Sequence, residues 1–344
     1  MMDDRTNGAP APGDGHGARR PAVVLANLGT PSAPTPSHVR RFLREFLSDR
    51  RVVETHPLLW RPVLEGVVLR VRPRVVAKKY AGIWTPQGSP LMRYTLRQAE
   101  LLGRRMPDVD VQAAMRYGEP GLGAVLDALH ARGTRRVAVL PAYPQYSATT
   151  VASLNDVAAQ WLRRNRDGFD LRLVRSFPTA PAYIDALASA LESHWGRCGR
   201  PDFAAGDAVV VSFHSIPEAM DRAGDPYRSE CMGTVAALEA RLGLARGALT
   251  VAFQSVFGPA AWLGPATIDT VTRLGARGCA RLDVICPGFM ADCLETLEEI
   301  DQLNREAFIR AGGSGFHYVP WGNDSEGAVS ALAEQARTAV AGWV

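Results

Sequence analysis

The segment Ala208-Val209-Val210-Val211-Ser212-Phe213-His214 is the most informative stretch of the sequence for the fold. Its first four residues are apolar and three of them are β-branched, which favours a β-strand. An unbroken apolar run, as opposed to an alternating one, is typical of a strand whose sheet carries helices on both faces. Such strands belong to parallel sheets, so the segment predicts an α/β fold.

Short apolar runs and longer helical patterns alternate along the rest of the chain. The other expected strands span 23–28, 111–117, 136–143, 171–177, 249–254 and 281–286. The main expected helices span 37–47, 149–164, 180–195, 227–242 and 294–311. This alternation is typical of parallel strands joined by crossover helices.

The pattern divides into two similar halves, in which polar or unusual loops follow the strands. We expect two Rossmann-like domains, each a parallel sheet flanked by helices, at 21–185 and 186–320. Because open parallel sheets bind ligands beyond the carboxyl ends of their strands, two facing sheets would form an interdomain cleft. Residues 1–20 are rich in Gly, Pro, Ala and Asp and are expected to form a disordered tail. A final helix within 321–344 can pack back on the first domain.

Composition excludes several classes of protein. The 344 residues are 47% hydrophobic and 22% charged, which excludes wholesale disorder, collagen and coiled coil. The net charge of +4 (39 − 35) is too small to indicate a nucleic-acid partner. There is no long apolar run, export signal, GxGxxG or GxxxxGK[ST] motif, so we expect a cytoplasmic protein without nucleotide chemistry. The five cysteines form no CxxC pair and are expected to be reduced thiols.

His214 is a candidate base or metal ligand, because it ends the strand 208–213. Imidazole is the side chain that exchanges protons most readily near neutral pH. A histidine that only hydrogen-bonds a loop is the alternative.

An acidic row follows the strand 281–286. Asp292, Glu295 and Glu299 are spaced by three and four residues, which places them on one face of a helix, with Glu298 beside the row. Such a row can hold a divalent cation or carry protons. A solvated acidic helix start, favoured by the helix dipole, is the alternative.

Aromatic residues gather where strands pass into loops: Tyr117, Tyr143, Tyr146 and Trp262. Lining a cleft, they would suit a flat apolar ligand, and Arg116 could pair with a ligand carboxylate. Ordinary core filling is the alternative for each ring.

The stretch 55–84 combines apolar residues with Arg61, Arg70, Arg72, Arg74, Lys78 and Lys79. A basic amphipathic surface of this kind can lie on an anionic bilayer. A helix packed on its own domain, with solvated arginines, is the alternative.

Many short motifs, taken in order, resemble those of the ferrochelatases, most closely the proteobacterial protoporphyrin ferrochelatases. The resemblance runs from about residue 23 to 311. The matching segments are Leu25-Ala26-Asn27-Leu28-Gly29-Thr30-Pro31, Phe46-Leu47-Ser48-Asp49, Gly88-Ser89-Pro90-Leu91, Tyr143-Pro144-Gln145-Tyr146-Ser147, Ser212-Phe213-His214-Ser215-Ile216-Pro217, Gly224-Asp225-Pro226-Tyr227, Phe253-Gln254-Ser255 and Asp292-Cys293-Leu294-Glu295-Thr296-Leu297.

The resemblance implies insertion of ferrous iron into protoporphyrin IX, giving protoheme and two protons, at the end of heme biosynthesis. It places the catalytic, iron-binding pair on His214 and Glu295, and the path of protons or metal along Asp292 and Glu299. Its porphyrin-binding residues fall on Leu28, Arg116, Tyr117, Tyr146 and Trp262. Iron and porphyrin are the expected partners, and surface contact with a membrane is compatible with the basic stretch. The oligomeric state is left open.

The sequence departs from the family at two points. Cys293 stands where some members have a second histidine. Some members carry a [2Fe–2S] cluster on C-terminal cysteines; since no cysteine follows Cys293, no such cluster and no resident cofactor are expected. Two alternatives remain open: a chelatase for a more polar substrate such as coproporphyrin, and a non-catalytic porphyrin or heme carrier.

Overall fold

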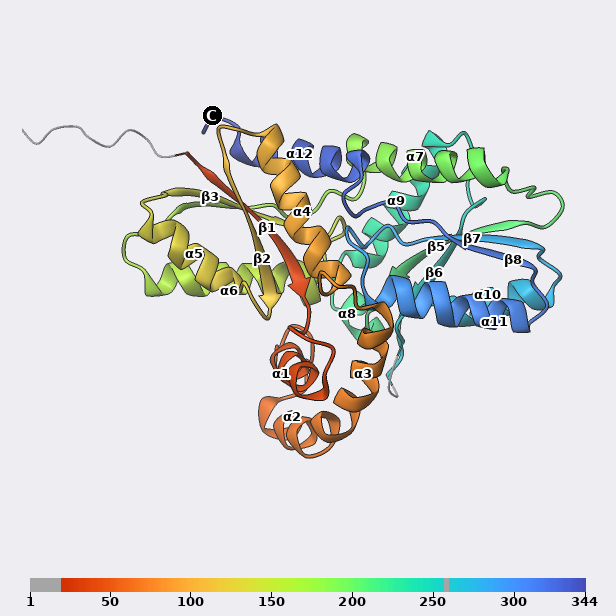
Figure 1. Ribbon diagram of the computed structural model, residues 1–344, viewed down its shortest axis with the longest axis horizontal. Coiled ribbons are helices and arrows are strands. Elements are labelled where there is room, and N and C mark those ends of the chain that lie inside the picture. The colour runs from red at the N-terminus through yellow and green to blue at the C-terminus, as the bar shows by residue number, and fades with distance from the viewer. Residues whose placement is uncertain (1–19, 257–259) are drawn as a thin grey trace, which may run out of the picture.

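The computed structural model describes residues 20–256 and 260–344 and contains two parallel four-stranded sheets (Figure 1). The strand orders, β2-β1-β3-β4 and β6-β5-β7-β8, are the same topology used twice. The predicted α/β class and its two Rossmann-like halves are therefore confirmed. The strands are β1 (Ala22–Gly29), β2 (Asp110–Tyr117), β3 (Arg136–Pro141), β4 (Asp170–Leu173), β5 (Ala208–His214), β6 (Thr250–Gln254), β7 (Arg281–Ile285) and β8 (Gly315–Tyr318).

Helices connect the strands and cover the sheets. They are α1 (Pro36–Leu47), α2 (Pro57–Val63), η1 (Leu64–Val68), α3 (Leu69–Ile83), α4 (Pro90–Arg105), α5 (Leu122–Ala131), η2 (Ala148–Ala152), α6 (Ser153–Arg164), α7 (Pro181–Cys198), α8 (Glu218–Arg222), α9 (Tyr227–Arg241), α10 (Thr267–Ala276), η3 (Glu295–Asn304), α11 (Arg305–Arg310) and α12 (Glu326–Val340). The three η segments are π-helices.

The seven expected strands are present, and the sequence prediction missed β8. This strand pairs on one side only, with β7, and its Gly-Phe-His-Tyr sequence lacks the apolar run that marks a strand buried on both faces. The fourth strand is shorter than expected and ends at Leu173, because it too is an edge strand whose residues are partly exposed.

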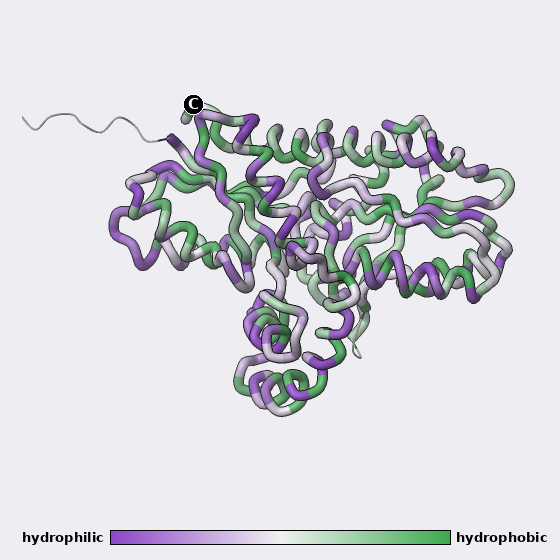
Figure 2. The backbone as a smooth tube through the Cα atoms, viewed as in Figure 1, coloured by the Kyte–Doolittle hydropathy of each residue, from purple (hydrophilic) through white to green (hydrophobic). Residues whose placement is uncertain are grey.

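Both faces of each sheet are buried, as the continuous apolar runs predict. Along β1, Val23 and Leu25 enter one core cluster while Val24 enters another. Along β5, Val209 and Val211 face the first of these clusters, and Val210 faces a third. In Figure 2 the strands accordingly run through the molecule as largely hydrophobic segments.

The two halves share one continuous core. The cluster that receives Val23 and Val209 also takes in apolar residues of α4, α7, α9 and α12. The helices α7 and α12 lie side by side along the upper edge of Figure 1, and α12 also contacts α4 and β3. Near the C-terminus, the Trp343 carbonyl accepts a hydrogen bond from Arg136 of β3. The boundary predicted at 185/186 lies within α7, and the exact division into domains stays a prediction. The tail expected at residues 1–20 lies outside the described residues except for Arg20.

Residues 36–83 form a helical lobe beside the first sheet, at the bottom of Figure 1. Its helices α1, α2, η1 and α3 have their own core, built around Val39, Phe42 and Tyr80. Trp60 joins two parts of the lobe by donating to the Leu47 carbonyl at 2.7 Å. Tyr117, from the end of β2, enters this core and so ties the lobe to the sheet.

Candidate functional site

His214 is the last residue of β5 and is half-buried at the carboxyl edge of the second sheet. Its Nδ1 lies 2.6 Å from the Ser215 carbonyl oxygen, which can only accept a hydrogen bond. Nδ1 therefore carries the proton in the neutral ring, and the lone pair lies on Nε2. The predicted base thus has its free nitrogen defined by a neighbouring carbonyl.

The end of β6 holds the acidic residues in place. Ser255, which follows β6 with a left-handed φ of 66°, donates to Glu299 from its backbone N–H at 2.7 Å and from its hydroxyl at 2.5 Å. The side chain of Gln254 donates to the Glu295 carbonyl at 2.8 Å. A non-glycine residue with this φ persists where surrounding contacts hold it, here by two bonds to one carboxylate.

Glu299 is the group that links the predicted residues electrostatically. It interacts with both His214 and Glu295. Burial raises the pKa of Glu299 above its ordinary value, although hydrogen bonds from Ser255 and the charge of His214 act against this. The structure therefore brings His214, Glu295 and Glu299 together and favours the protonated form of Glu299; their roles in catalysis stay a prediction.

Besides Glu299, Glu295 has a buried thiol and two buried tyrosine side chains near it. The Cys293 thiol is buried and lies in hydrogen-bonding range of the Glu295 carboxylate. The pKa of Cys293 is raised mainly by burial and, to a smaller extent, by the charge of Glu295. The thiol is therefore protonated and donates to Glu295. Tyr80 and Tyr143 also interact with Glu295, and burial raises the pKa of both hydroxyls. The Tyr143 hydroxyl is buried and has no hydrogen-bond partner among the described residues.

The acidic row does not lie on a regular α-helix, which corrects the sequence prediction. A π-helix begins at Glu295, and its wider turn still leaves Glu295 and Glu299 on one face. Asp292 precedes the helix, so it is not part of that face. Its carboxylate accepts hydrogen bonds from Thr296 at 2.8 Å, Tyr318 at 2.6 Å and Asn323 at 2.7 Å. These bonds give Asp292 a structural role at the start of the helix, and its place on a proton or metal path stays a prediction.

Arg116 and Tyr117 converge on Asp49, a residue to which the sequence analysis assigned no role. Arg116 Nη2 lies 2.5 Å and the Tyr117 hydroxyl 2.8 Å from Asp49 Oδ2. Ser153 donates to the same oxygen at 2.5 Å. Burial raises the pKa of Asp49, but the hydrogen bonds from Ser153, Arg51 and Tyr117 and the charge of Arg116 together lower it below its usual range. Arg116 therefore already has a carboxylate partner within the protein.

Leu28 lies one residue before the end of β1 and packs on the core of the helical lobe, together with Tyr117. Gly29, next to it, has a φ of 103°, and a Cβ there would come within 1.8 Å of the Tyr117 carbonyl oxygen. This glycine lets β1 and β2 end side by side. Leu28 therefore lies against the same core of the helical lobe as Tyr117.

Tyr146 and Trp262 lie on loops that contact residues of the second half. The Tyr146 backbone N–H donates to Glu230 at 2.7 Å, and the Tyr146 ring lies under the Arg175 guanidinium, 4.7 Å from its centroid. Trp262 forms a β-bridge with Pro217, three residues beyond His214. Both rings are half-buried near the strand ends, and their role in binding a ring ligand stays a prediction.

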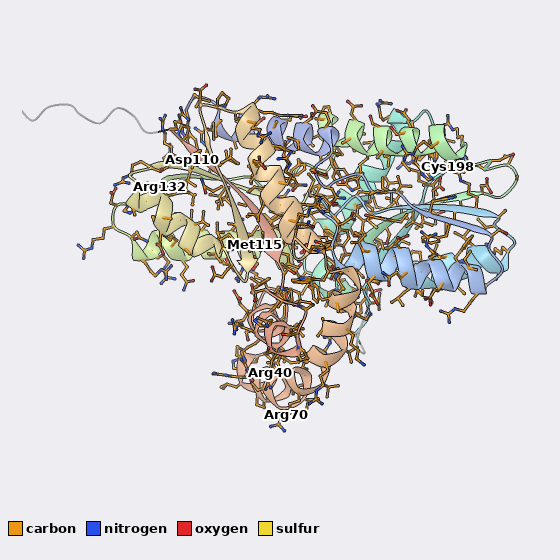
Figure 3. All side chains as sticks on the ribbon, viewed as in Figure 1. Arg40, Arg70, Asp110, Met115, Arg132 and Cys198 are labelled. Atoms are coloured by element: carbon orange, nitrogen blue, oxygen red, sulfur yellow. The ribbon has the colours of Figure 1, made fainter. Side chains whose placement is uncertain are left out.

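Cavities elsewhere on the molecule do not involve these residues. One of about 570 Å³ is lined by Arg20, Asp110 and Arg132 among others, and Figure 3 labels the last two far from the lobe. Another, of about 390 Å³, lies along Arg305 and Arg310. Neither is lined by a predicted site residue, so the site is defined here by its side-chain contacts and not by a cavity.

Comparison with known proteins supports the resemblance in the sequence. Residues 20–340 match the family model described as Ferrochelatase. The chain belongs to the ferrochelatase family. A ferrochelatase of Methylibium petroleiphilum is 49% identical over 340 residues, covering 97% of this chain and 92% of that protein. A ferrochelatase of Polaromonas sp. is 46% identical, with the same coverage of each chain.

Family membership confirms the predicted enzyme class, a metal-inserting lyase of heme synthesis. A solved structure of SirB from Bacillus subtilis with Fe3+ is similar to 74% of this chain and to 92% of its own, with a TM-score of 0.51 and 14% identity. At that identity the similarity concerns the fold, which is the chelatase arrangement of two parallel sheets.

Proposed function

We propose that this chain inserts ferrous iron into protoporphyrin IX, and that His214 and Glu295 carry the reaction. The observation that supports this most directly is the convergence of His214, Glu295 and Glu299 at the carboxyl edge of the second sheet. One imidazole with a defined lone pair and two carboxylates supply both the proton acceptors and the ligands that the reaction requires.

The chemistry explains why these groups are needed. A free porphyrin carries two N–H protons that occupy its centre, and both must leave before the metal can bind the four nitrogens. A base that lies beyond the ring face accepts a proton best when the ring is bent, and binding of the rest of the ring must supply the energy of bending. His214 Nε2 accepts a pyrrole proton in this proposal. Glu299, whose pKa burial raises, receives protons next along the helix face.

Ferrous iron enters as substrate and loses water to protein ligands. A mixed site of imidazole and carboxylate is acceptable to this ion. Glu295 supplies the carboxylate, and the Cys293 thiol, which donates to it, keeps the carboxylate oriented. No resident cofactor is part of the proposal.

Porphyrin contacts come from the first half and from the loops. The half-buried Leu28, Tyr146 and Trp262 provide apolar and aromatic surface for a flat ring in this proposal, and the fully buried Tyr117 supports Leu28 from the core of the lobe. Because Asp49 already neutralises Arg116, that side chain offers little charge for a substrate carboxylate. This favours protoporphyrin, with two carboxylates, over coproporphyrin, with four.

Zinc insertion into protoporphyrin, followed by porphyrin fluorescence, tests the proposal. We expect the purified chain to metallate protoporphyrin faster than coproporphyrin. His214→Ala and Glu295→Gln should each lower turnover at least 100-fold, because each removes a group that touches the reacting atoms. His38→Ala, at a half-buried histidine of the helical lobe, is the control and should keep native turnover. Porphyrin binding without metallation would instead identify a carrier.

We further propose that the helical lobe contacts an anionic lipid surface. No helix among the described residues has the length and apolarity to cross a bilayer. The lobe nevertheless exposes Leu58 by 79%, Leu59 by 70% and Val71 by 62%. The exposed Arg70 and Arg74 lie beside Val71 on α3, and Figure 3 shows Arg70 at the tip of the lobe, pointing outward. Apolar side chains flanked by arginines are the composition of an interfacial helix.

Flotation with vesicles of phosphatidylcholine and phosphatidylglycerol tests this contact. Replacing Arg70 and Arg74 by Gln should lower binding about 30-fold, since each basic residue near an anionic surface contributes about 1 kcal/mol. The same change at Arg163 and Arg164, exposed at the end of α6, is the matched control and should leave binding intact. Equal loss in both double variants would contradict the assignment of the surface to the lobe.

A further inference from the structure

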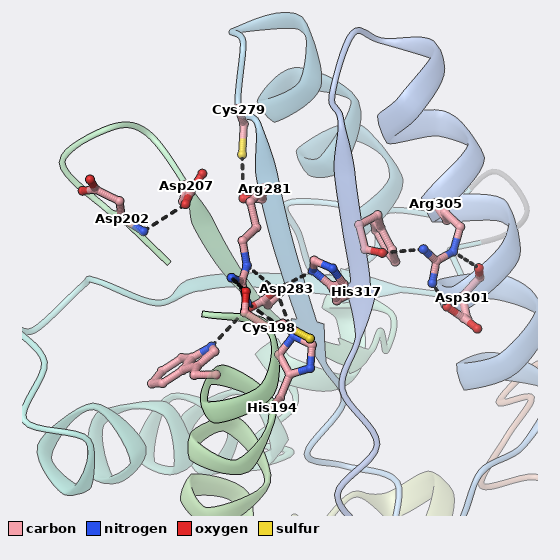
Figure 4. A network of polar contacts seen from close by, with 12 residues as sticks. His194, Cys198, Asp202, Asp207, Cys279, Arg281, Asp283, Asp301, Arg305 and His317 are labelled. Atoms are coloured by element: carbon pink, nitrogen blue, oxygen red, sulfur yellow. Dashed lines mark hydrogen bonds and ion pairs between the residues drawn. The ribbon is translucent and has the colours of Figure 1, made fainter. Parts of the chain in front are cut away.

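A compact group of metal-ligating side chains lies away from the site described above. His194 in the last turns of α7, Asp283 in β7 and His317 in β8 bring their ligand atoms within 4.8 Å of one another (Figure 4). Asp283 and His317 are register partners on neighbouring strands, so their side chains leave the same face of the sheet. Asp283 is paired with Val209, five residues before His214, which puts the group about 16 Å back along the strands from the carboxyl edge.

The spacing of the three atoms is that of ligands around one ion. Asp283 Oδ1 lies 2.9 Å from His317 Nδ1 and 3.4 Å from His194 Nε2. A first-row ion such as Zn2+ forms bonds of about 2.1 Å, so neighbouring ligand atoms around it lie roughly 3.0–3.5 Å apart. The two distances need little adjustment to accept such an ion.

The buried carboxylate is already oriented by other donors. Trp195 donates to Asp283 Oδ2 at 2.9 Å, and Arg281 donates to Oδ1 and Oδ2 at 3.1 Å each. Hydrogen bonds of this kind commonly fix a metal-binding carboxylate in its position. Because Arg281 also neutralises the charge of Asp283, folding does not require two imidazoles on the same oxygen. Their presence is therefore unexplained by charge balance alone.

We propose that His194, Asp283 and His317 bind one divalent transition-metal ion of the Zn2+ and Co2+ class. Cys198, an exposed free thiol four residues after His194, is not among the ligand atoms that lie within 4.8 Å of one another. Two imidazoles and one carboxylate, with a water in the fourth position, are a donor set suited to a tetrahedral ion of this class. The half-buried His317 gives the ion access from solvent.

Arg281 acts as a competitor in this site. Its Nη2 lies 3.4 Å from His194 Nε2, on the lone pair that an ion would use. The ion must displace that contact, while the two hydrogen bonds from Arg281 to Asp283 can remain. The positive charge beside the site therefore weakens binding, and removal of the charge should strengthen it.

Competition titration of the metal-free full-length chain with Zn2+ and a chromophoric chelator tests the proposal. To separate this site from the catalytic one, binding is measured in a His214→Ala, Glu295→Gln background as well as in the native chain. We expect one bound Zn2+ to persist in that background. His317→Ala should lower the affinity for this Zn2+ at least 100-fold, and Arg281→Gln should raise the affinity about tenfold.

The matched control is His130→Ala. His130 lies 3.6 Å from Asp167, which also pairs with Arg135, so this group repeats the histidine, aspartate and arginine of the proposed site but has a single imidazole. The change should not alter Zn2+ binding. Imidazole NMR signals of the native chain provide a readout that needs no variant, since Zn2+ should shift those of His194 and His317. Unchanged signals, or native affinity in His317→Ala, would overturn the proposal.

Discussion

Asp49→Ala is expected to destabilise the protein more than any exposed ion-pair variant. The side chain of Asp49 is 8% exposed and that of its partner Arg116 is 18% exposed. Its carboxylate also accepts from Tyr117 and Ser153. Removing one partner of a buried pair costs about 3–5 kcal/mol, because the other charge is left uncompensated. Since Arg116 keeps its hydrogen bonds to Ser153, we expect the lower end, about 3 kcal/mol.

The matched comparison is Asp156→Ala, which removes a bidentate pair with Arg51 whose side chains are 44% (Arg51) and 53% (Asp156) exposed. An exposed pair contributes about 0–1 kcal/mol. Urea unfolding at pH 7 measures both variants. The pKa of Asp49 is lowered in the folded state, so its contribution is present above the ordinary carboxylate pKa and is lost as the pH falls through the folded value. Equal destabilisation by the two variants would refute the reasoning from burial.

Three further outcomes are expected. Gly29→Ala should lower stability by more than about 2 kcal/mol, since its Cβ would meet the Tyr117 carbonyl at 1.8 Å; Gly123→Ala, with open space around it, should leave stability unchanged or raise it slightly in thermal unfolding. Ser255→Ala should lower kcat for zinc insertion more than it changes KM for porphyrin, because it removes one of two bonds that position Glu299; a change in KM alone would contradict this. Glu299→Gln should raise the free energy of unfolding at pH 8, because burial raises the pKa of Glu299 and so disfavours its charged form in the folded state. This gain should disappear below the ordinary carboxylate pKa, and a gain that grew on acidification would contradict the prediction.

Local patterns predicted the fold well, because the strands are buried on both faces. The strands at 22–29 and 208–214 begin with unbroken apolar runs, at 22–26 and 208–211, and such short β-branched runs favour a strand buried on both faces. The edge strand at 315–318 lacks it and was missed. The π-helix from Glu295 was missed because its hydrogen bonding, and not its residue types, distinguishes it from an α-helix.

The residues that position the site were harder to predict than those that occupy it. His214 and Glu299 follow from strand ends and helix spacing. Asp49 accepts a hydrogen bond from Ser153, which is 104 residues away in the sequence. Ser255 donates to Glu299, which is 44 residues away. A single sequence holds no local signal for such pairs, although Asp49 and Ser255 both lie in motifs that carry the family resemblance.

The continuous core beneath α7 and α12 has a consequence for how a substrate is received. Since the same buried cluster supports both sheets, swinging them apart would expose a large apolar area to water. We therefore expect the two sheets to keep the relative position they take on folding when a substrate binds, without hinge closure around it.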